Sequence, residues 1–339
     1  MKYYLFLITL FVLFFIHCSR EVDEPEDQEL YPVPSSTLSI QTINAVLVDS
    51  YNEIWIGTDE GLYKYDRKIW LKHNAFEDFK VSSLTLHSDR ILMATDSGAY
   101  IIQADNTNHP LIEKQSPLET LPFGAISIFD NGMGDRKWIG LADGVAMFDG
   151  TAWLKNKAIT RNLVSISNVR GIAFRANDCF LATHGRFLYR IIFNPETDAI
   201  TGASQLLGGA ENPILNYNGE LTTDTIFCVH AGTDSSIWFG SPKGLTRNKE
   251  STKVDKGIFE YFLRSERVHC VYEFHDGSIW AGTENGIFVK SGSMWTNYDV
   301  SDGLPGSFVR CISEESDGSV WIGTNRGISH FKEGMFINF

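Results

Sequence analysis

The sequence predicts an all-β fold built from seven copies of one four-stranded unit, and three observations support this. A phrase of the type Ile-Trp-Ile-Gly-Thr recurs, its copies are spaced regularly, and a glycine follows most copies at a fixed distance. The clear copies contain Trp55, Trp238, Trp280 and Trp321. Trp238 and Trp280 are 42 residues apart, and Trp280 and Trp321 are 41 apart. A fixed period of this length indicates an array of one supersecondary unit.

Each unit shows the same succession of strands. A short apolar strand is followed by a turn, and Asp276-Gly277 and Asp317-Gly318 suit a tight hairpin there. The tryptophan strand comes next, ends in a turn with glycine at a fixed place, and is followed by a third strand and an aromatic fourth segment. The first strands are expected at 43–48, 81–86, 125–129, 169–174, 226–230, 268–273 and 309–313.

Three weaker copies complete the array. Met93, Trp138 and Leu181 stand there at the tryptophan position. Four short antiparallel strands in a repeat of about 40 residues are typical of a β-propeller blade. The 301 residues of 39–339 give 43 residues for each of seven units and leave no room for another domain. The sequence therefore predicts a single seven-bladed β-propeller of four-stranded antiparallel blades, with the tryptophans packed between blades.

The repeated phrase resembles the two-component regulator propeller repeat. The resemblance is carried by Val309-Arg310-Cys311-Ile312 and by residues 317–328, which read Asp-Gly-Ser-Val-Trp-Ile-Gly-Thr-Asn-Arg-Gly-Ile. It covers residues 43–339 and is weakest in the second and fourth units. Such propellers often form the extracytoplasmic sensing part of bacterial hybrid histidine kinases. Because no kinase sequence follows the last unit here, the resemblance implies a sensing role exercised through a partner protein.

The first 18 residues predict export. Lys2 and the apolar run from Tyr3 to Ile16 match a secretory signal, because 14 apolar residues are too few to span a bilayer. Cys18 follows and is predicted to be the lipidated residue of a lipoprotein signal; an ordinary signal peptide or a poorly cleaved anchor is the alternative. Residues 19–38 are acidic, contain prolines and are expected to form a linker. The expected location is the outer membrane, on its periplasmic side or at the cell surface.

Charge and cysteine placement narrow the function further. The net charge of −13 and the lack of a cluster of Lys and Arg argue against nucleic-acid binding, because phosphate contacts require clustered cations. Besides Cys18 the chain has Cys179, Cys228, Cys270 and Cys311. The last three share one position of the repeat, so free, buried and unreactive thiols are expected there rather than disulfides.

Candidate ligand-binding residues are expected where the units differ in chemistry. The position after the first apolar residue of each inner strand varies most, and in propellers it lies near the mouth of the central channel, beside the loop that follows the tryptophan strand. These two positions supply the candidate site: Asn44, Arg170, His184, Arg186, His269, Arg310 and Arg326. Its cationic members suit a carboxylate or phosphate ligand. A solvated polar rim without a ligand is the alternative.

Two insertions, 105–124 and 194–224, exceed the repeat and are expected to serve recognition, with a mobile loop as the alternative. No Gly-x-Ser-x-Gly, His-Glu-x-x-His or phosphate-binding loop occurs in the sequence. The sequence therefore predicts a non-catalytic propeller, without cofactor or metal, that binds a small molecule such as a glycan or an anion, or a protein partner. The alternative is a propeller lyase or hydrolase with its site at the mouth and His269 as acid or base.

Overall fold

The computed structural model describes residues 38, 42–87, 90–103, 112–113, 125–130, 137–148, 153–155, 166–175, 178–185, 188–193, 200–205, 225–249 and 258–339. The predictions for the signal segment 1–18 with Cys18, for nearly all of the linker 19–38, and for Arg186 concern residues outside these ranges. Most of the two insertions also lies outside them. Among the residues that are described, no helix is long and apolar enough to cross a membrane.

The described strands form seven four-stranded antiparallel sheets, and each sheet consists of four consecutive strands. Sheet 1 contains β1 (Ile43–Val48), β2 (Ile54–Thr58), β3 (Gly61–Tyr65) and β4 (Trp70–Lys72). Sheet 2 contains β5 (Val81–His87), β6 (Arg90–Thr95), β7 (Gly98–Gln103) and β8 (Ile112–Glu113). Sheet 3 contains β9 (Ala125–Asp130), β10 (Lys137–Leu141), β11 (Gly144–Phe148) and β12 (Trp153–Lys155).

The remaining sheets follow the same plan. Sheet 4 contains β13 (Val169–Arg175), β14 (Asp178–Thr183), β15 (Leu188–Phe193) and β16 (Ile200–Gln205). Sheet 5 contains β17 (Cys228–Ala231), β18 (Ile237–Ser241), β19 (Gly244–Lys249) and β20 (Ile258–Phe262). Sheet 6 contains β21 (Val268–Glu273), β22 (Ile279–Thr283), β23 (Gly286–Ser291) and β24 (Met294–Tyr298). Sheet 7 contains β25 (Val309–Glu314), β26 (Val320–Thr324), β27 (Gly327–Lys332) and β28 (Met335–Asn338).

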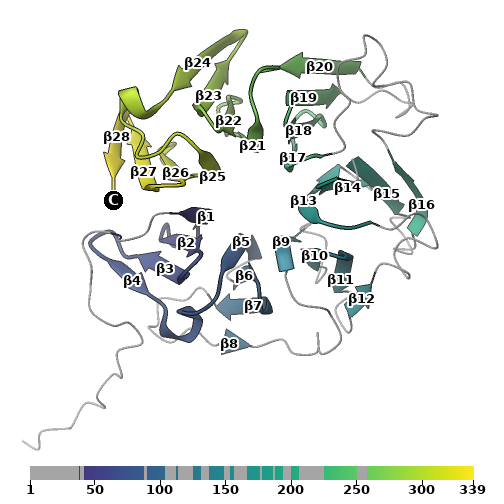
Figure 1. Cartoon of the computed structure of the whole chain (residues 1–339), viewed down its shortest axis with the longest axis horizontal. Coiled ribbons are helices and arrows are strands. Elements are labelled where there is room, and N and C mark those ends of the chain that lie inside the picture. The colour runs from purple at the N-terminus through teal and green to yellow at the C-terminus, as the bar shows by residue number, and fades with distance from the viewer. Residues whose placement is uncertain are drawn as a thin grey trace, which may run out of the picture. The chain divides into compact units, whose positions relative to one another are not determined.

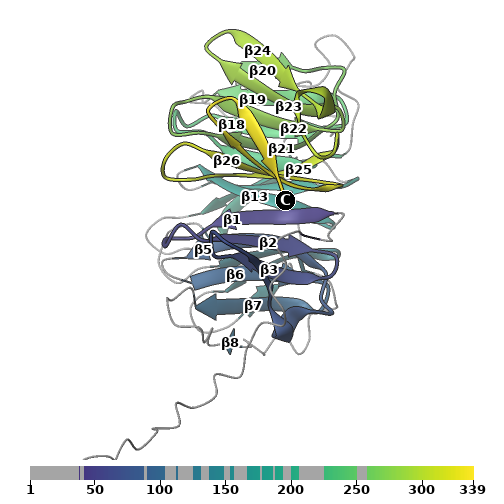
Figure 2. The ribbon, with the colours of Figure 1, turned by 90° about the vertical axis from the view of Figure 1, so that its left-hand side faces the viewer.

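The first strands of the sheets follow one another around a ring (Figure 1). Each of β1, β5, β9, β13, β17 and β21 lies against the first strand of the next sheet, and β25 lies against β1. Within sheet 2 the order β5, β6, β7, β8 runs outward from the centre of the ring (Figures 1 and 2). The prediction of an all-β propeller is confirmed.

The glycine of the repeated phrase is required by the packing of the next sheet. A Cβ added to Gly57 would lie 2.4 Å from Cγ1 of Val81, the first residue of sheet 2. A Cβ on Gly323 would lie 2.3 Å from Sγ of Cys311 and 2.7 Å from Cγ2 of Ile43. All three distances are far below van der Waals contact. The repeated glycine therefore lets adjacent sheets approach closely.

The threonine after this glycine closes the turn to the third strand. The Thr58 hydroxyl donates to the carbonyl of Gly61 at 2.9 Å and accepts from the N–H of Glu60 at 3.0 Å. The same pair of hydrogen bonds is made by the hydroxyls of Thr95, Ser241, Thr283 and Thr324. Gly61 has φ +126°, a conformation that side chains disfavour. The Gly-Thr pair and the later glycine are thus parts of one turn.

The tryptophans pack between sheets, as the sequence predicts. Trp55 is buried against Phe76, Val81 and Met93 on the side of sheet 2. Its Nε1 donates to Oδ2 of Asp49 at 2.8 Å, so the buried polar atom is satisfied.

The cysteines of the described part of the chain are free thiols. Cys179 is buried, whereas Cys228, Cys270 and Cys311 are only half-buried as whole residues, which corrects the expectation of full burial. Desolvation of the sulfur nevertheless raises the pKa of Cys270 to about 12. A thiol with such a pKa is unreactive at neutral pH.

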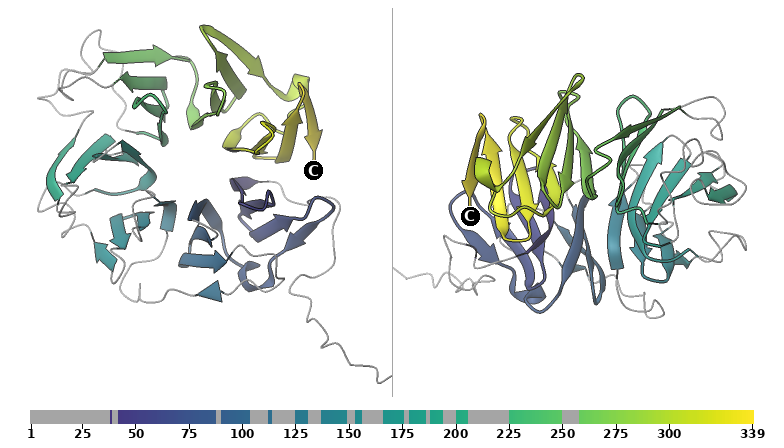
Figure 3. Two further views of the ribbon diagram at one scale, coloured as in Figure 1. Left: turned by 180° about the vertical axis from the view of Figure 1, so that it is seen from behind. Right: turned by 45° about the horizontal axis from the view of Figure 1, so that its top comes forward.

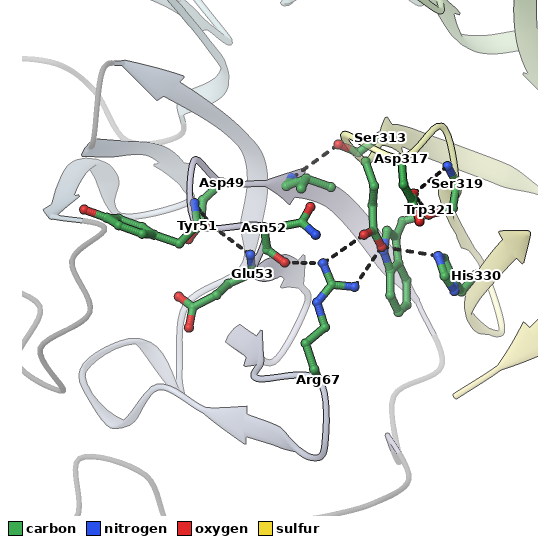
Figure 4. Close-up of polar contacts among 12 residues, drawn as sticks. Asp49, Tyr51, Asn52, Glu53, Arg67, Ser313, Asp317, Ser319, Trp321 and His330 are labelled. Atoms are coloured by element: carbon green, nitrogen blue, oxygen red, sulfur yellow. Dashed lines mark hydrogen bonds and ion pairs between the residues drawn. The ribbon is translucent and has the colours of Figure 1, made fainter.

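The seam between sheets 7 and 1 closes the ring, and the two sheets lie side by side (Figure 3). Each consists of consecutive strands, so no strand crosses the seam and side chains must hold it. Arg67 donates from Nη1 and Nη2 to the two carboxylate oxygens of Glu315, each at 2.9 Å. Trp321 Nε1 also donates to Glu315, and His330 Nε2 lies 3.2 Å from its Oε1. Figure 4 shows Arg67 of sheet 1 reaching toward Trp321 and His330 of sheet 7.

An aromatic cluster lies across the same seam. The ring of Trp70 crosses that of Trp321 edge to face at 6.1 Å, and Tyr65 lies 5.8 Å from Trp321. Phe339 packs on all three, at 5.3 Å from Tyr65 and from Trp321 and 6.1 Å from Trp70. At the same seam, the N–H of Val48 in β1 donates to the hydroxyl of Ser313 in β25 at 3.3 Å. The seam therefore combines tightly packed rings with an ion pair between the buried Glu315 and the exposed Arg67.

Candidate ligand-binding site

The variable position of the repeat lies at a shift in strand register. In six sheets the register between the first and second strands skips one residue of the first strand. The skipped residues are Asn44, Ser82, Ile126, Arg170, His269 and Arg310. A bulge of this kind leaves one residue outside the ladder and re-aims its side chain. This residue can therefore differ from sheet to sheet while the first and second strands stay paired.

Several of these side chains and their neighbours are in contact near the starts of the inner strands. We name this set the bulge rim: Asn44, Arg170, Phe227, His269, Phe308 and Arg310. Phe308 precedes β25, close to the register shift at Arg310, and Phe227 precedes β17, in the sheet that has no such shift.

One end of the bulge rim joins sheets 7, 1 and 2 by polar contacts. Arg310 Nη2 donates to Oδ1 of Asn44 at 3.0 Å, and Asn44 Nδ2 donates to Oδ1 of Asp59 at 2.9 Å. The same Asp59 oxygen lies 2.7 Å from Nζ of Lys80. The hydrogen bond from Lys80, with help from Asn44, holds the pKa of Asp59 below its usual value against desolvation. Asp59 therefore already forms an ion pair with Lys80.

The other end of the bulge rim is a tier of stacked rings from sheets 5, 6 and 7. The His269 ring stacks on Phe227 with centroids 4.3 Å apart and planes 15° from parallel. The centroid of the Phe308 ring lies 4.4 Å from that of His269, with the planes tilted by 52°. The Arg310 guanidinium lies 5.2 Å from the Phe308 centroid, and that of Arg267 lies 5.3 Å from Phe227. Cations therefore flank the tier at both ends.

His269 also contacts a carboxylate. Its Nε2 lies 3.0 Å from Oε1 of Glu284, to which Arg267 Nε donates at 2.8 Å. Burial lowers the pKa of His269 from its ordinary value of 6.5, against Glu284, which raises it. Although desolvation acts to raise the pKa of Glu284, hydrogen bonds from Arg267 and His269 keep it below its usual value. The imidazole is therefore neutral and the carboxylate ionised at neutral pH.

Two guanidinium groups of the bulge rim have no carboxylate of their own. Neither Arg310 nor Arg170 forms an ion pair with any residue in the described ranges, and Nε of Arg310 is buried without a hydrogen-bond partner there. Arg170 is exposed as a whole residue. Desolvation of part of its side chain, followed by the charge of Arg310, lowers the pKa of Arg170. The two cations thus repel one another.

The structure brings some predicted site residues together and leaves others apart. Asn44, His269 and Arg310 join one set of contacts, and Arg170 interacts with Arg310 through charge. His184 lies at the edge of the tier, 6.2 Å from the Phe227 centroid. Arg326 is exposed, and no side-chain contact links it to the bulge rim. Arg186 lies outside the described residues.

Sequence reasoning missed Phe308, Arg267 and Lys80. Each stands one residue before the first apolar residue of its inner strand, so the position preceding the strand carries the missing signal. No cluster of three or more side chains that could hold a metal ion occurs within the described ranges.

A family model for the two component regulator propeller matches residues 37–60 and 303–326. These matches fall on the first and last sheets, at the repeated phrase. No curated protein matches the chain significantly in sequence.

Many solved structures share the fold. The extracellular domain described as that of the hybrid two component system BT3049 from B. thetaiotaomicron is 20% identical with a TM-score of 0.69, over 88% of this chain. The chain spans only about 40% of the length of the extracellular domains it matches. A streptogramin B lyase is 16% identical with a TM-score of 0.63, over 87% of this chain and 95% of that one. YCF48 bound to D1 peptide is 14% identical with a TM-score of 0.60, over 89% and 94%. At these identities the likeness shows the fold alone.

Proposed function

We propose that this chain, which carries the two-component regulator propeller repeat, is a seven-bladed propeller of the cell envelope that binds a ligand or a protein partner and performs no chemistry. It acts as a sensory or complex-forming accessory to that partner. The observation that carries the proposal is the bulge rim, where Arg310 and Arg170 stand without a carboxylate among the described residues.

The distribution of chemistry around the ring supports binding over a purely structural role. The glycine, threonine and tryptophan of the repeated phrase recur because they hold the sheets together. At the register shift the same chain carries Asn44, Ser82, Arg170, His269 and Arg310. A position that is free of the ladder and differs in charge from sheet to sheet suits recognition.

The proposed location rests on the first residues of the sequence. The apolar run Tyr3 to Ile16 and Cys18 support export and lipidation, with the linker 19–38 between the anchor and the propeller at 39–339. The extracellular origin of several proteins with the same fold supports export as well. We propose an outer membrane lipoprotein, on the periplasmic side or at the cell surface.

Thermal unfolding of the purified chain with Cys18→Ser tests the binding function. Oligosaccharides, peptides and organic anions are compared as classes, and a ligand at a hundredfold excess over its Kd adds about 2.7 kcal/mol to the stability of the folded ring. We expect one class to raise Tm, and we expect Phe308→Ala to abolish that rise. Peptides are included because YCF48, which shares the fold, is seen with a bound peptide. No rise with any class contradicts the binding of a small molecule or peptide and leaves a protein as the proposed partner.

A second candidate function is a lyase or hydrolase that uses His269. The observation that favours it is the 3.0 Å contact between His269 and Glu284, which orients an imidazole that is neutral and able to accept a proton. A propeller with the same fold is a streptogramin B lyase. His269→Gln then removes all turnover of a substrate found by screening, while the free energy of unfolding stays within about 1 kcal/mol. Absence of turnover by the unmodified chain rejects this candidate.

A further inference from the structure

We infer that Arg310 and Arg170 form the binding site for the oxyanion group of a small organic ligand, such as a carboxylate. This inference rests on the proposed function and names the ligand class of the same rim. It follows from the pairing of charges around the bulge rim, the fixed position of Arg310 and the apolar surroundings.

The two carboxylates that contact the bulge rim, Asp59 and Glu284, already form ion pairs. Asp59 is matched by Lys80 at 2.7 Å, and Glu284 is matched by Arg267 at 2.8 Å. Arg310 and Arg170 occupy the same register-shift position in sheets 7 and 4, and neither forms an ion pair with a described residue, although the charge of Arg310 also acts on Asp59. Two such cations at one rim attract anions to this place.

Two contacts fix the position of the Arg310 guanidinium without pairing its charge. Asn44 accepts from its Nη2 at 3.0 Å, and its guanidinium lies over the Phe308 ring at 5.2 Å. Neither contact neutralises the charge, and Nε has no partner among the described residues. A planar guanidinium fixed in this way meets a carboxylate, sulfate or phosphate through paired N–H donors, with little loss of side-chain freedom on binding.

The surroundings strengthen the interaction. Phe227, His269 and Phe308 form a stacked apolar wall beside Arg310, and a neutral His269 adds no competing charge. A charge pair beside such a wall is screened less than one in open water. An anion placed at Arg310 also relieves the repulsion between Arg310 and Arg170.

Calorimetric titration of the purified full chain with succinate, sulfate and inorganic phosphate tests the inference. We expect saturable binding of at least one of the three, weakened about tenfold or more by Arg310→Gln and by Arg170→Gln, because each substitution removes charge-assisted donors. Lys68→Gln is the matched control, since it removes one exposed cation at the turn between β3 and β4, at the opposite end of the strands from the register shift. It should leave the affinity within about twofold. The relative affinities of succinate and the inorganic ions tell a carboxylate site from a phosphate or sulfate site.

Equal weakening by Lys68→Gln and Arg310→Gln overturns the inference, because the ions then respond to overall charge only. Absence of binding by all three ions overturns it as well. If a neutral ligand instead raises Tm and Phe308→Ala abolishes that rise, the proposed binding function stands and only the anion assignment fails. Arg170→Gln keeps the test decisive if Arg310→Gln does not fold, because Arg170 is exposed.

Discussion

The seam between sheets 1 and 7 and the bulge rim use charge in opposite ways. In the seam, Glu315 is only 5% exposed and receives both Nη groups of Arg67. In the bulge rim, Arg310 and Arg170 have no carboxylate partner in the described part of the chain. A buried charge that holds two sheets together must be paired, because an unpaired one costs several kcal/mol. The charge without an ion-pair partner at the rim is the basis for the binding proposed there.

The largest effect is expected from breaking the seam. Glu315→Ala leaves the buried Trp321 N–H without its acceptor and removes the ion pair with the exposed Arg67, and should lower the free energy of unfolding by about 2–3 kcal/mol. Denaturant unfolding of the purified chain measures the loss. Glu60→Ala, at an exposed turn, is the matched control and should stay within about 0.5 kcal/mol. Equal losses in the two variants would show that the ion pair does not hold the seam.

Acid should weaken the same seam. Burial acts to raise the pKa of Glu315, but hydrogen bonds from His330, Arg67 and Trp321 outweigh it and lower the pKa from 4.5 to about 2. Because the folded pKa is below the unfolded one, the stabilisation is complete above pH 4.5 and is lost as the pH falls toward 2. We expect it to amount to roughly 3 kcal/mol. Stability curves of Glu315→Gln and the unmodified chain should converge over this range, and parallel curves would contradict the assignment.

A smaller effect is expected from crowding the seam. Gly323→Ala places a Cβ within 2.7 Å of Ile43 across the seam and still closer to the Cys311 sulfur. The cost should be about 1–3 kcal/mol, as for other overpacked cores. Removing the sulfur with the additional change Cys311→Ala should restore part of the loss, which unfolding of the double variant measures. An undiminished stability in Gly323→Ala would mean that the sheets are not packed this closely.

The smallest effect on stability is expected at the rim. Arg310→Gln loses one hydrogen bond to Asn44 but relieves the repulsion with Arg170, so the free energy of unfolding should change by no more than about 0.5 kcal/mol. Denaturant unfolding beside Glu315→Ala gives the comparison directly. A loss as large as that of Glu315→Ala would make Arg310 a part of the scaffold.

The repeat allowed much of the fold to be predicted. The inner strand expected at 43–48 is found as Ile43–Val48, and the one expected at 309–313 is found as Val309–Glu314. The strand expected at 226–230 begins only at Cys228, because Phe227 lies at the start of the sheet and joins the stacked tier. The local sequence pattern predicts the positions of the strands because every unit packs its strands in the same way.

Contacts between sheets were less predictable. Arg67 and Glu315 are 248 residues apart, so no local pattern links them. The variable position was found from the sequence, but the stacking of Phe227 and Phe308 on His269 joins three sheets and has no local signature. Side chains that meet across the ring depend on the curvature of the whole array, which a single repeat does not encode.

One measurement tests most directly whether the seam carries stability and the rim carries binding. It is thermal unfolding of the unmodified chain, Glu315→Ala and Arg310→Gln, each with and without a saturating concentration of the tightest-binding ion among succinate, sulfate and phosphate. We predict that Glu315→Ala lowers Tm but keeps the rise caused by this ion, and that Arg310→Gln keeps Tm but loses the rise. If Arg310→Gln retains the full rise, or if both variants lose Tm and rise together, the separation between seam and rim is contradicted.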